Sequence, residues 1–451
     1  MPEERLKSQT EFTTSDLRRL ILPLIVEQLL AILVGLADSM MVSYVSESAM
    51  SAVSLVDAVN VLLIQVFAAL ATGGAVVAGQ YLGRRETGRA CVSSDQLVIF
   101  MTLVSLVVMA LMYLGRNLII HGLFGAIDPD VAANAMTYLL IVSASIPFIA
   151  LYNAGAALFR VMGNSRISMN VSIIMNIINV CGNALLVFYF RIGVAGVAWP
   201  TLISRAFAAV VIIVLLFSQK YEIHMSRPFR PRPEWAIIRN ILWIGVPNGV
   251  ENGMFQFGKL LLLSLVSSFG TASIAANSIG NSICSFQILG GNSIALAMIT
   301  VVSRCVGAGN YGAARAYTKR LMKLTYISMW VLCAAILAAL PLILRLYNVS
   351  DEASQLATTI IWIHGIFAMT IWPLSFTLPN TLRAAGDTRF TMLVSASSMW
   401  AVRIGAGYLI GGYMGFGVVG VWIAMIIDWG VRLIFFIARY HGKKWEQMAL
   451  K

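Results

Sequence analysis

Charged side chains are scarce in this chain of 451 residues. Lys, Arg, Asp and Glu make up 12% of it, whereas a soluble globular domain carries about 25%. Hydrophobic residues account for 59%, above the roughly 45–50% of soluble domains. This balance excludes an ordinary cytosolic enzyme and a disordered protein, because a chain with so few charges cannot keep so much apolar surface in water.

Cysteines are few and the motifs of common enzymes are missing. The five cysteines stand apart, without a CxxC pair or a His spacing typical of zinc, which excludes a disulfide scaffold and a structural zinc domain. There is no HExxH, GxSxG or P-loop motif, so we expect no metalloprotease, serine hydrolase or ATP-driven pump. We therefore predict that the protein is not an enzyme and has no cofactor.

Long apolar runs, in contrast, recur from end to end. Each is long enough to cross about 30 Å of hydrocarbon as a helix, and none shows the alternation of a membrane β-barrel. Backbone groups find no partner in lipid, so helices are the expected spans. The predicted helices lie near residues 17–43, 53–80, 92–114, 131–157, 167–190, 193–218, 236–267, 273–303, 321–344, 353–380, 390–413 and 417–438. The expected fold class is an all-α integral membrane protein with twelve transmembrane helices.

Lys and Arg are distributed unequally between the loops of this topology. The even-numbered loops and both tails hold 25 of them, whereas the other side holds only Arg116, Arg191 and Arg345. Positive charge stays on the cytoplasmic side, so we predict a multi-pass protein of the cell membrane (a bacterial inner, or plasma, membrane) with both termini cytoplasmic. The net charge of +12 is then a topology signal, and no nucleic-acid partner is expected. The polar first 16 residues predict no cleaved signal peptide.

The sequence is duplicated at an offset of about 224 residues. PLIVE at 23–27 returns as PNGVE at 247–251, and GVAGV at 193–197 returns as GVVGV at 417–421. A repeat of six helices, an even number, runs parallel to its copy. We predict an N-lobe at 17–218 and a C-lobe at 236–440, joined by a linker at 219–235 and flanked by cytoplasmic tails at 1–16 and 441–451. A substrate path is expected between the lobes; the alternative is a duplicated scaffold without one.

These motifs, in this order, resemble those of the multidrug and toxic compound extrusion (MATE) transporters, which belong to the multidrug/oligosaccharidyl-lipid/polysaccharide flippase superfamily. The resemblance covers essentially the whole chain and rests on Pro247 and Glu251, FGTASIAANSI (269–279), LRAAGDTRF (382–390), GVAGVAWPT (193–201) and GVVGVWIAMIIDW (417–429). It implies a secondary active antiporter that exports small amphipathic, typically cationic, drugs or toxic metabolites in exchange for Na⁺ or H⁺. Two lobes would alternate between outward and inward openings. We expect a monomer whose partners are the lipid bilayer and a small-molecule substrate.

The alternative function is a flippase for a lipid-linked precursor or another lipid, as in distant relatives of the same superfamily. Those proteins commonly have fourteen helices and a strongly cationic cavity. This chain has twelve predicted helices and cavity candidates that are mostly acids and amides, which favours efflux.

Ionisable residues in mid-membrane are costly and are functional candidates by default. Glu251, on the seventh predicted helix, lies beside a polar stripe that should face water. A carboxylate there can exchange a proton, a sodium ion or a cationic substrate, unless it is a hydrogen-bonded packing residue. Asn277 and Asn281 on the next helix line the same cavity or join helices by hydrogen bonds. The stripe consists of Asn248, Asn252, Gln256 and Lys259.

A second candidate site surrounds Asp38 on the first predicted helix, where Glu27 lies three turns away on the same face. By the resemblance, an N-lobe ion site that can hold Na⁺ would consist of Asp38, Asn179, Asn183 and Thr201. Asn183 stands where many members carry Asp, and the lost charge weakens a site for a hard cation. The alternative role of the asparagines is interhelical hydrogen bonding.

Lys259 affects the expected substrate. Its ammonium either pairs with an acid such as Asp38 or stays neutral; if it is charged and faces the cavity, it favours zwitterions or anions over cations. On the last two helices, Asp428 and Arg432 are one turn apart and predict a structural ion pair that Arg403 could join.

Two further features concern gating. Pro373 and Pro379 predict a bend in the tenth helix, which lacks an acidic residue. Arg160 and Arg383 occupy equivalent positions of the two halves and are interpreted as cytoplasmic anchors or gate latches.

Overall fold

A computed structural model describes residues 12–123, 127–226, 233–345, 347 and 349–449. Parts of the predicted tails and linker (1–11, 227–232 and 450–451) lie outside the described residues. The chain forms two compact units, one of Thr14–Gly249 and one of Val250–Lys451 together with Met1–Thr13. We call them the N-unit and the C-unit and describe each by itself.

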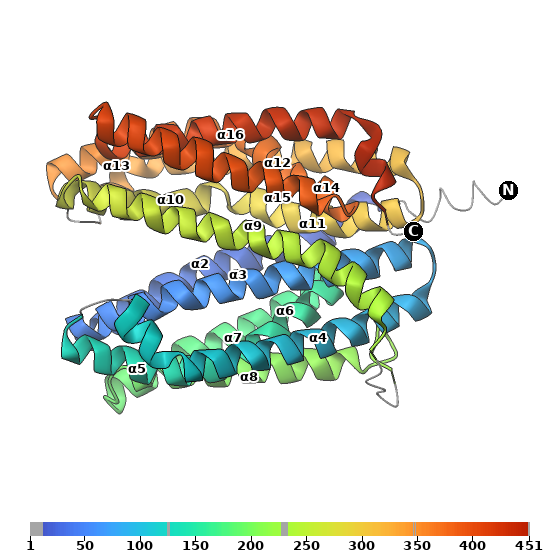
Figure 1. The fold of residues 1–451 in the computed structure, drawn as a ribbon, viewed down its shortest axis with the longest axis horizontal. Helices are drawn as coiled ribbons and strands as arrows, with labels where there is room; N and C mark the ends of the chain where they lie inside the picture. The colour runs from blue at the N-terminus through green and yellow to red at the C-terminus, as the bar shows by residue number, and fades with distance from the viewer. Residues whose placement is uncertain (1–11, 124–126, 227–232, 346, 348, 450–451) are drawn as a thin grey trace. The chain divides into compact units, whose positions relative to one another are not determined.

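The N-unit is a bundle of helices that run side by side (Figure 1). Two long helices open it, and two helices begin at a polar N-cap: the Ser46 hydroxyl accepts a hydrogen bond from the Ala49 amide at the start of α3, and the Asp128 carboxylate accepts one from the Asp130 amide at the start of α5. The helices are α2 (Thr14–Ser43), α3 (Glu47–Gly83), α4 (Thr87–Leu114), η1 (Leu118–Leu123), α5 (Pro129–Ala144), α6 (Ile146–Val161), α7 (Ser165–Ala184), η2 (Leu185–Tyr189) and α8 (Ala195–Leu216).

Helix α9 (Trp235–Ser267) is continuous across the boundary between the units, which lies at Gly249 and Val250. The sequence predicts the division earlier, in the linker at 219–235. The difference has a physical reason: a Cβ on Gly245 would lie 3.1 Å from the Leu70 backbone, so the first part of α9 packs closely on α3. That part of α9 therefore belongs to the N-unit.

The C-unit repeats the bundle. Its helices are the rest of α9, α10 (Thr271–Gln287), α11 (Leu289–Gly307), α12 (Tyr311–Arg345), α13 (Asp351–Thr370), η3 (Pro373–Thr377), α14 (Pro379–Ala384), α15 (Thr388–Ser397), η4 (Ser398–Ile404), η5 (Gly407–Tyr413), α16 (Gly417–His441) and η6 (Lys443–Gln447). The segments η3, η4 and η5 are π-helical turns. The predicted bend is present: α13 and the Pro373–Ala384 segment meet at 64°.

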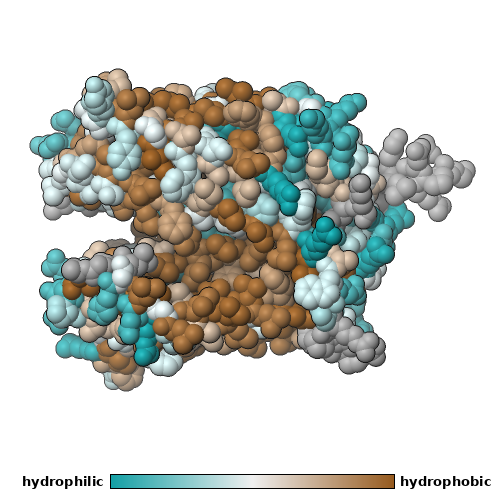
Figure 2. Space-filling view, viewed as in Figure 1, coloured by the Kyte–Doolittle hydropathy of each residue, from teal (hydrophilic) through white to brown (hydrophobic). Residues whose placement is uncertain are grey.

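The described helices confirm the predicted all-α membrane fold. Nine are long and apolar enough to cross a membrane, and the bent pairs α5–α6 and α13–α14 raise that number to 11. The remaining predicted span is α9, which carries the polar stripe. Exposed leucines and valines follow one face of α4, where Leu103, Val107 and Leu111 are 60%, 58% and 61% exposed. On the face shown in Figure 2, helix flanks are hydrophobic and helix ends hydrophilic, as a bilayer requires.

The duplication is visible in local geometry within each unit. Gly163 (φ +83°) ends α6 and Gly386 (φ +95°) ends α14, each donating to the carbonyl three residues earlier, at Arg160 and Arg383. This Schellman ending requires a left-handed residue, which glycine adopts freely. Close packing repeats too, because a Cβ on Gly196 or on Gly420 would lie within 3.2 Å of backbone atoms of the preceding helix.

Two arginines occupy left-handed positions in the first half where the second half has glycine. Arg85 (φ +64°) corresponds to Gly309 (φ +69°), and Arg191 (φ +50°) corresponds to Gly415 (φ +78°), each 224 residues later. A left-handed conformation costs an L-residue with a side chain about 1–2 kcal/mol. The two halves therefore keep the same turns even where their sequences differ.

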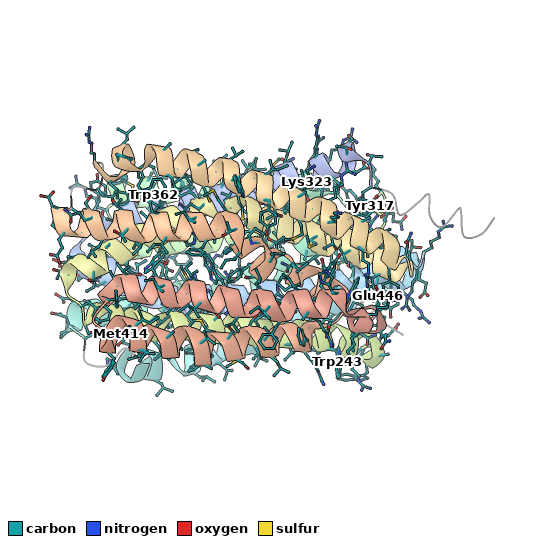
Figure 3. All side chains as sticks on the ribbon, turned by 90° about the horizontal axis from the view of Figure 1, so that it is seen from above. Trp243, Tyr317, Lys323, Trp362, Met414 and Glu446 are labelled. Carbon is teal, nitrogen blue, oxygen red and sulfur yellow. The ribbon has the colours of Figure 1, made fainter. Side chains whose placement is uncertain are left out.

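The described part of the C-terminal tail folds back on the C-unit. Trp445 in η6 is fully buried, and its neighbour Glu446 accepts a hydrogen bond from Nε of Arg315 on α12 at 2.8 Å and forms an ion pair with the same arginine. Figure 3 shows Glu446 and Tyr317 toward one end of this unit and Trp362 and Met414 toward the other. The predicted cytoplasmic tail at 441–451 is thus an ordered anchor in its described part.

Candidate functional site

A cluster of acids and amides lies inside the N-unit around Asp38. The Asn183 amide donates to the Asp38 carboxylate at 2.7 Å and contacts Asn179 at 3.4 Å. Asn179 in turn donates to the Thr201 hydroxyl at 3.1 Å. Helices α2, α7 and α8 bring these four side chains together, so the residues that the sequence predicts as an N-lobe ion site form one hydrogen-bonded chain.

The same cluster contains two ionisable residues, Asp57 and Arg205, that the sequence analysis did not place in the site. Asp57 on α3 accepts a hydrogen bond from the Tyr138 hydroxyl at 3.1 Å. Arg205 on α8 donates to Ser145 at 2.8 Å and to Asn60 at 3.4 Å. Both charges act electrostatically on Asp38. One signal could have found Arg205, because it follows Thr201 by one helical turn and so shares its face.

The charges of this cluster do not balance. Asp38 and Asp57 carry two negative charges when ionised, whereas Arg205 supplies one positive charge and is held by neutral oxygens. Asn183 also has a buried Oδ1 with no hydrogen-bond partner among the described residues. An unpaired buried acceptor costs about 1–3 kcal/mol. One monovalent cation, or one proton on a carboxylate, would neutralise the cluster and give Asn183 a partner.

A hard cation here would take its ligands from carboxylate, amide and hydroxyl oxygens. Among the described residues, no group of three or more His, Cys, Asp or Glu side chains is placed to hold a metal ion. The oxygens of Asp38, Asn183 and Thr201 are of the type that Na⁺ and other hard cations prefer. The chemistry of the cluster therefore suits a sodium ion or a proton, and not a transition metal.

Glu27 lies in a different environment from Asp38. It is buried, and it accepts a hydrogen bond from the Ser168 hydroxyl on α7 at 3.0 Å. Eleven residues of helix, about 16 Å, separate it from Asp38. The two acids, which the sequence places on one face of the helix, thus have different partners: Glu27 binds Ser168, and Asp38 binds Asn183.

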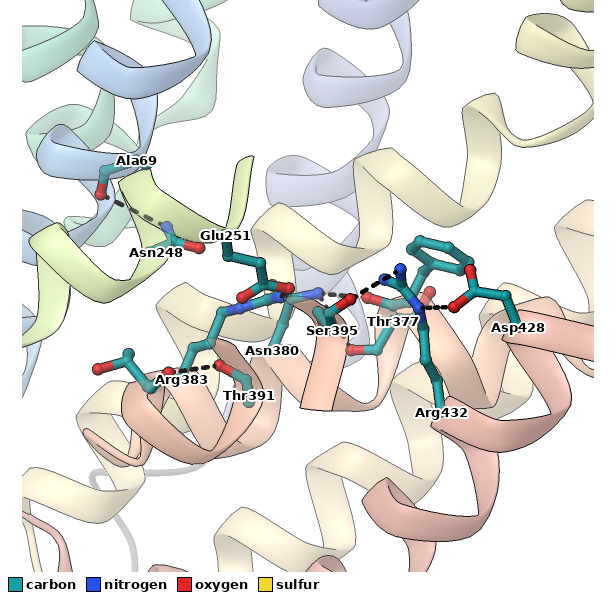
Figure 4. A network of polar contacts seen from close by, with 12 residues as sticks. Ala69, Asn248, Glu251, Thr377, Asn380, Arg383, Thr391, Ser395, Asp428 and Arg432 are labelled. Carbon is teal, nitrogen blue, oxygen red and sulfur yellow. Dashed lines mark hydrogen bonds and ion pairs between the residues drawn. The ribbon is translucent and has the colours of Figure 1, made fainter. Parts of the chain in front are cut away.

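In the C-unit, Glu251 is buried and forms an ion pair. Its Oε1 accepts a hydrogen bond from Nη2 of Arg383 at 2.6 Å, and Arg383 also donates to Asn380 at 3.0 Å (Figure 4). Arg383, interpreted from the sequence as a loop residue, lies in α14 because the Pro373–Ala384 segment continues the tenth span beyond its bend. Glu251 keeps one buried oxygen, Oε2, without a partner in the described chain.

The residues of the polar stripe of α9 differ in burial and in hydrogen-bond partners. Asn248 falls in the N-unit, where it donates to the Ala69 carbonyl at 3.5 Å. Asn252 and Gln256 are half-buried in the C-unit, and Lys259 is exposed. On α10, Asn277 accepts a hydrogen bond from the Trp422 indole at 3.0 Å, and Asn281 donates to the Asn277 carbonyl. That geometry suits Asn277 to joining α10 and α16.

Three cations surround one aromatic ring in the C-unit. The ammonium of Lys259 lies 5.4 Å from the Phe255 ring centroid, and the guanidinium carbons of Arg403 and Arg432 lie 5.4 and 5.6 Å from it. We call Phe255 and these three residues the cationic cluster. Only Arg432 is paired within the described chain, through its Nε to Asp428 at 2.9 Å (Figure 4). The structural ion pair predicted for Asp428 and Arg432 is therefore present.

Comparison with known proteins gives one family over most of the chain. The family model MatE matches residues 23–185 and again 247–409, two segments that begin 224 residues apart, as the internal repeat does. An uncharacterized transporter YisQ of Bacillus subtilis is 28% identical over 97% of this chain and 96% of its own. A probable multidrug resistance protein NorM of Thermotoga maritima is 25% identical over 98% and 96%.

A solved structure with the same fold is described as the outward-facing conformation of a multidrug resistance MATE family transporter of the MOP superfamily. Its TM-score to this chain is 0.88 at 19% sequence identity, and the match covers 94% of this chain and 95% of that one.

Proposed function

We infer the function from the premise that this chain belongs to the MatE family of membrane transporters, whose model matches both of its halves. It is thus a transporter embedded in a membrane and not an enzyme. We propose that it is a secondary active efflux antiporter, which exports small amphipathic drugs or metabolites in exchange for a monovalent cation, H⁺ or Na⁺. Two lobes would alternate between outward and inward openings to carry this exchange.

The observation that carries the proposal is the unbalanced acid cluster of the N-unit. Asp38 and Asp57 exceed the positive charge of Arg205 by one, and the buried Asn183 Oδ1 has no partner in the described chain. An uncompensated negative charge inside a membrane protein is costly. The cluster can therefore bind one cation, which neutralises it, and can release that cation again. Binding and release of that cation is what couples an ion gradient to transport.

The buried ion pair of the C-unit supports the same proposal. Glu251 has one oxygen bound to Arg383 and one, Oε2, without a partner among the described residues. A proton or cation taken up at Oε2 weakens the attraction to Arg383, and the pair can then separate. Arg383 lies just beyond the bend at Pro373 and Pro379, so we propose that this separation moves α14 during the transport cycle.

We further propose that both termini are cytoplasmic in a bacterial plasma membrane and that the protein works as a monomer. The support for the orientation is the distribution of Lys and Arg between the two sides. The names of the curated relatives favour efflux of small molecules over the lipid-flippase alternative.

The test is efflux of a fluorescent organic dye from proteoliposomes, with a Na⁺ gradient and a pH gradient imposed separately. We expect one gradient, and not the other, to drive dye movement in the wild type. Asp38→Asn should abolish the driven movement, whereas Asp130→Asn, the same change at an exposed acid of the same unit, should leave it intact. Driven transport that is equal in Asp38→Asn and the wild type would refute the role of this cluster.

A further inference from the structure

The cationic cluster of the C-unit has no assigned role in the cation exchange proposed above. Lys259, Arg403 and Arg432 all lie within 5.6 Å of the Phe255 ring centroid, and a ring that attracts one cation does not neutralise three. The carboxylate that pairs with this cluster, Asp428, binds Arg432 and Ser398 through the same oxygen, Oδ1. Three positive charges therefore share one negative charge.

Two of the three cations have no hydrogen-bonded partner among the described residues. Arg403 is 8% exposed, and its buried Nε is unpaired. Lys259 contacts the Phe255 ring, and the charged neighbour that acts on it is a further cation, Arg403. An unpaired buried charge is costly. The buried Arg403, which has the exposed cation Lys259 as a charged neighbour, therefore favours an anionic partner from outside the chain.

The chemistry of that partner can be read from the cluster. A guanidinium presents a planar fork that matches a carboxylate through two parallel hydrogen bonds, and an ammonium adds a point charge. Phe255 is half-buried and Phe376 also contacts Arg432, at 5.3 Å, so an apolar or aromatic body can pack beside the charges. Lys259 is exposed, which leaves a way in from the surface of the unit.

We propose that the cationic cluster is a subsite for the carboxylate group of an amphipathic organic anion or zwitterion, held by Arg403 and Lys259 against Phe255. The proposal deepens the transport function above and rests on it for the view that this ligand is cargo. The two units then have opposite preferences: the N-unit cluster lacks one positive charge and the C-unit cluster lacks negative charge.

The test uses three probes with the same aromatic body and different charge: dansylglycine (anion), dansylglycinamide (neutral) and N-dansylethylenediamine (cation). Binding is followed by dansyl fluorescence on the purified full-length protein in phosphatidylcholine nanodiscs, without any gradient. We expect dansylglycine to bind about tenfold more tightly than dansylglycinamide, as a charge-assisted hydrogen bond predicts. The cationic probe should bind most weakly. Equal or tighter binding of the cationic probe would overturn the proposal.

Substitutions test which side chains bind the carboxylate of the probe. Lys259→Met and Arg403→Gln should each weaken dansylglycine binding about tenfold and leave dansylglycinamide binding unchanged. Lys319→Met, the same change at an exposed lysine of the same unit, should alter neither. Arg403 is buried, so its variant is accepted only if its thermal unfolding is cooperative; Lys259 is exposed and tests the proposal without that requirement. An unchanged preference for dansylglycine in Lys259→Met would refute the assignment.

A lipid headgroup could also supply an anion to this cluster. Repeating the titration in nanodiscs that contain phosphatidylglycerol separates the two sources. Unchanged dansylglycine binding supports a subsite for cargo, whereas competition by the anionic lipid would overturn it. Failure of the proposed transport function can be distinguished from failure of the proposed subsite. Selective dansylglycine binding without gradient-driven efflux would support the subsite and refute the antiporter proposal.

Discussion

Nη2 of Arg383 lies 2.6 Å from Oε1 of Glu251, so the two residues form a buried ion pair inside the C-unit. Both belong to the internal repeat: Glu251 corresponds to Glu27 and Arg383 to Arg160. In the N-unit, Glu27 accepts a hydrogen bond from Ser168, and Nε of Arg160 donates to the Ala156 carbonyl. The duplication thus preserves the residue types at both positions.

The Glu251–Arg383 pair makes a prediction for stability. Glu251→Gln and Arg383→Gln should each lower the free energy of unfolding by about 3 kcal/mol, because each leaves one buried charge unpaired. The double variant should lose less than the sum of the two. Chemical unfolding in detergent checks this, with Glu352→Gln on an exposed acid of the same unit as control. Additive losses would show that the two side chains do not interact.

The same pair makes a prediction for transport. Glu251→Gln removes the carboxylate that takes up a proton or cation at Oε2, so gradient-driven efflux should fall by at least tenfold even at temperatures where the variant stays folded. Dye efflux from proteoliposomes measures it. Efflux that matches the wild type would remove Glu251 from the mechanism and leave it a packing residue.

Asn183 offers a gain of function. Asn183→Asp adds a carboxylate next to Asp38, to which the asparagine now donates at 2.7 Å. The N-unit cluster would then lack two positive charges, so we expect the variant to bind the coupling cation more tightly and to release it more slowly. The measurement is the cation concentration at half-maximal efflux, which should fall. Asn176→Asp, on the same helix but outside the hydrogen-bonded chain around Asp38, is the control and should leave that concentration nearly unchanged.

Asn277 tests whether an amide in α10 serves packing or transport. Its side chain accepts the hydrogen bond of the Trp422 indole, so Asn277→Ala should cost about 1 kcal/mol of stability. Coupled efflux should persist at the wild-type rate per folded molecule. A large loss of efflux without loss of stability would place Asn277 on the substrate path instead.

The left-handed arginine turns give a prediction about folding alone. Arg191→Gly should raise the free energy of unfolding by up to about 1 kcal/mol, because glycine relieves the strain at φ +50°. Gly415→Ala, at the corresponding turn of the second half, should destabilise by a similar amount, since its φ is +78° and no other atom limits the site. Thermal unfolding compares them. Opposite signs are expected, and equal signs would contradict the correspondence of the two turns.

Particular residues explain how far the sequence could predict this molecule. The twelve spans and the 224-residue repeat follow from apolar runs and recurring motifs, because lipid dictates helix length. The cluster of Asp38, Asn179, Asn183 and Thr201 was found because spacing on a helix and resemblance to a family agree. The division of the compact units within α9 could not be predicted, since only the contact of Gly245 with α3 reveals that the start of α9 packs with the N-unit.

Contacts between distant helices could not be read in advance. Glu251 was identified, but its partner Arg383 was counted as a loop charge, because no periodicity shows that the chain continues as a helix beyond the bend. Lys259, Arg403 and Arg432 were each recognised as intramembrane cations. Nothing in their spacing indicates that α9, η4 and α16 bring all three to one Phe255 ring, since that depends on the packing angles of three helices.

The most direct test of the central claim is to record cargo and cation together in one preparation of proteoliposomes. Whichever dansyl probe binds the wild type most tightly is loaded inside, and internal pH and Na⁺ are followed as the probe leaves. We predict that one of these cations enters as the probe exits, and that both movements stop in Asp38→Asn while Asp130→Asn behaves as the wild type. Probe exit without cation entry, or cation entry that persists in Asp38→Asn, would contradict the account.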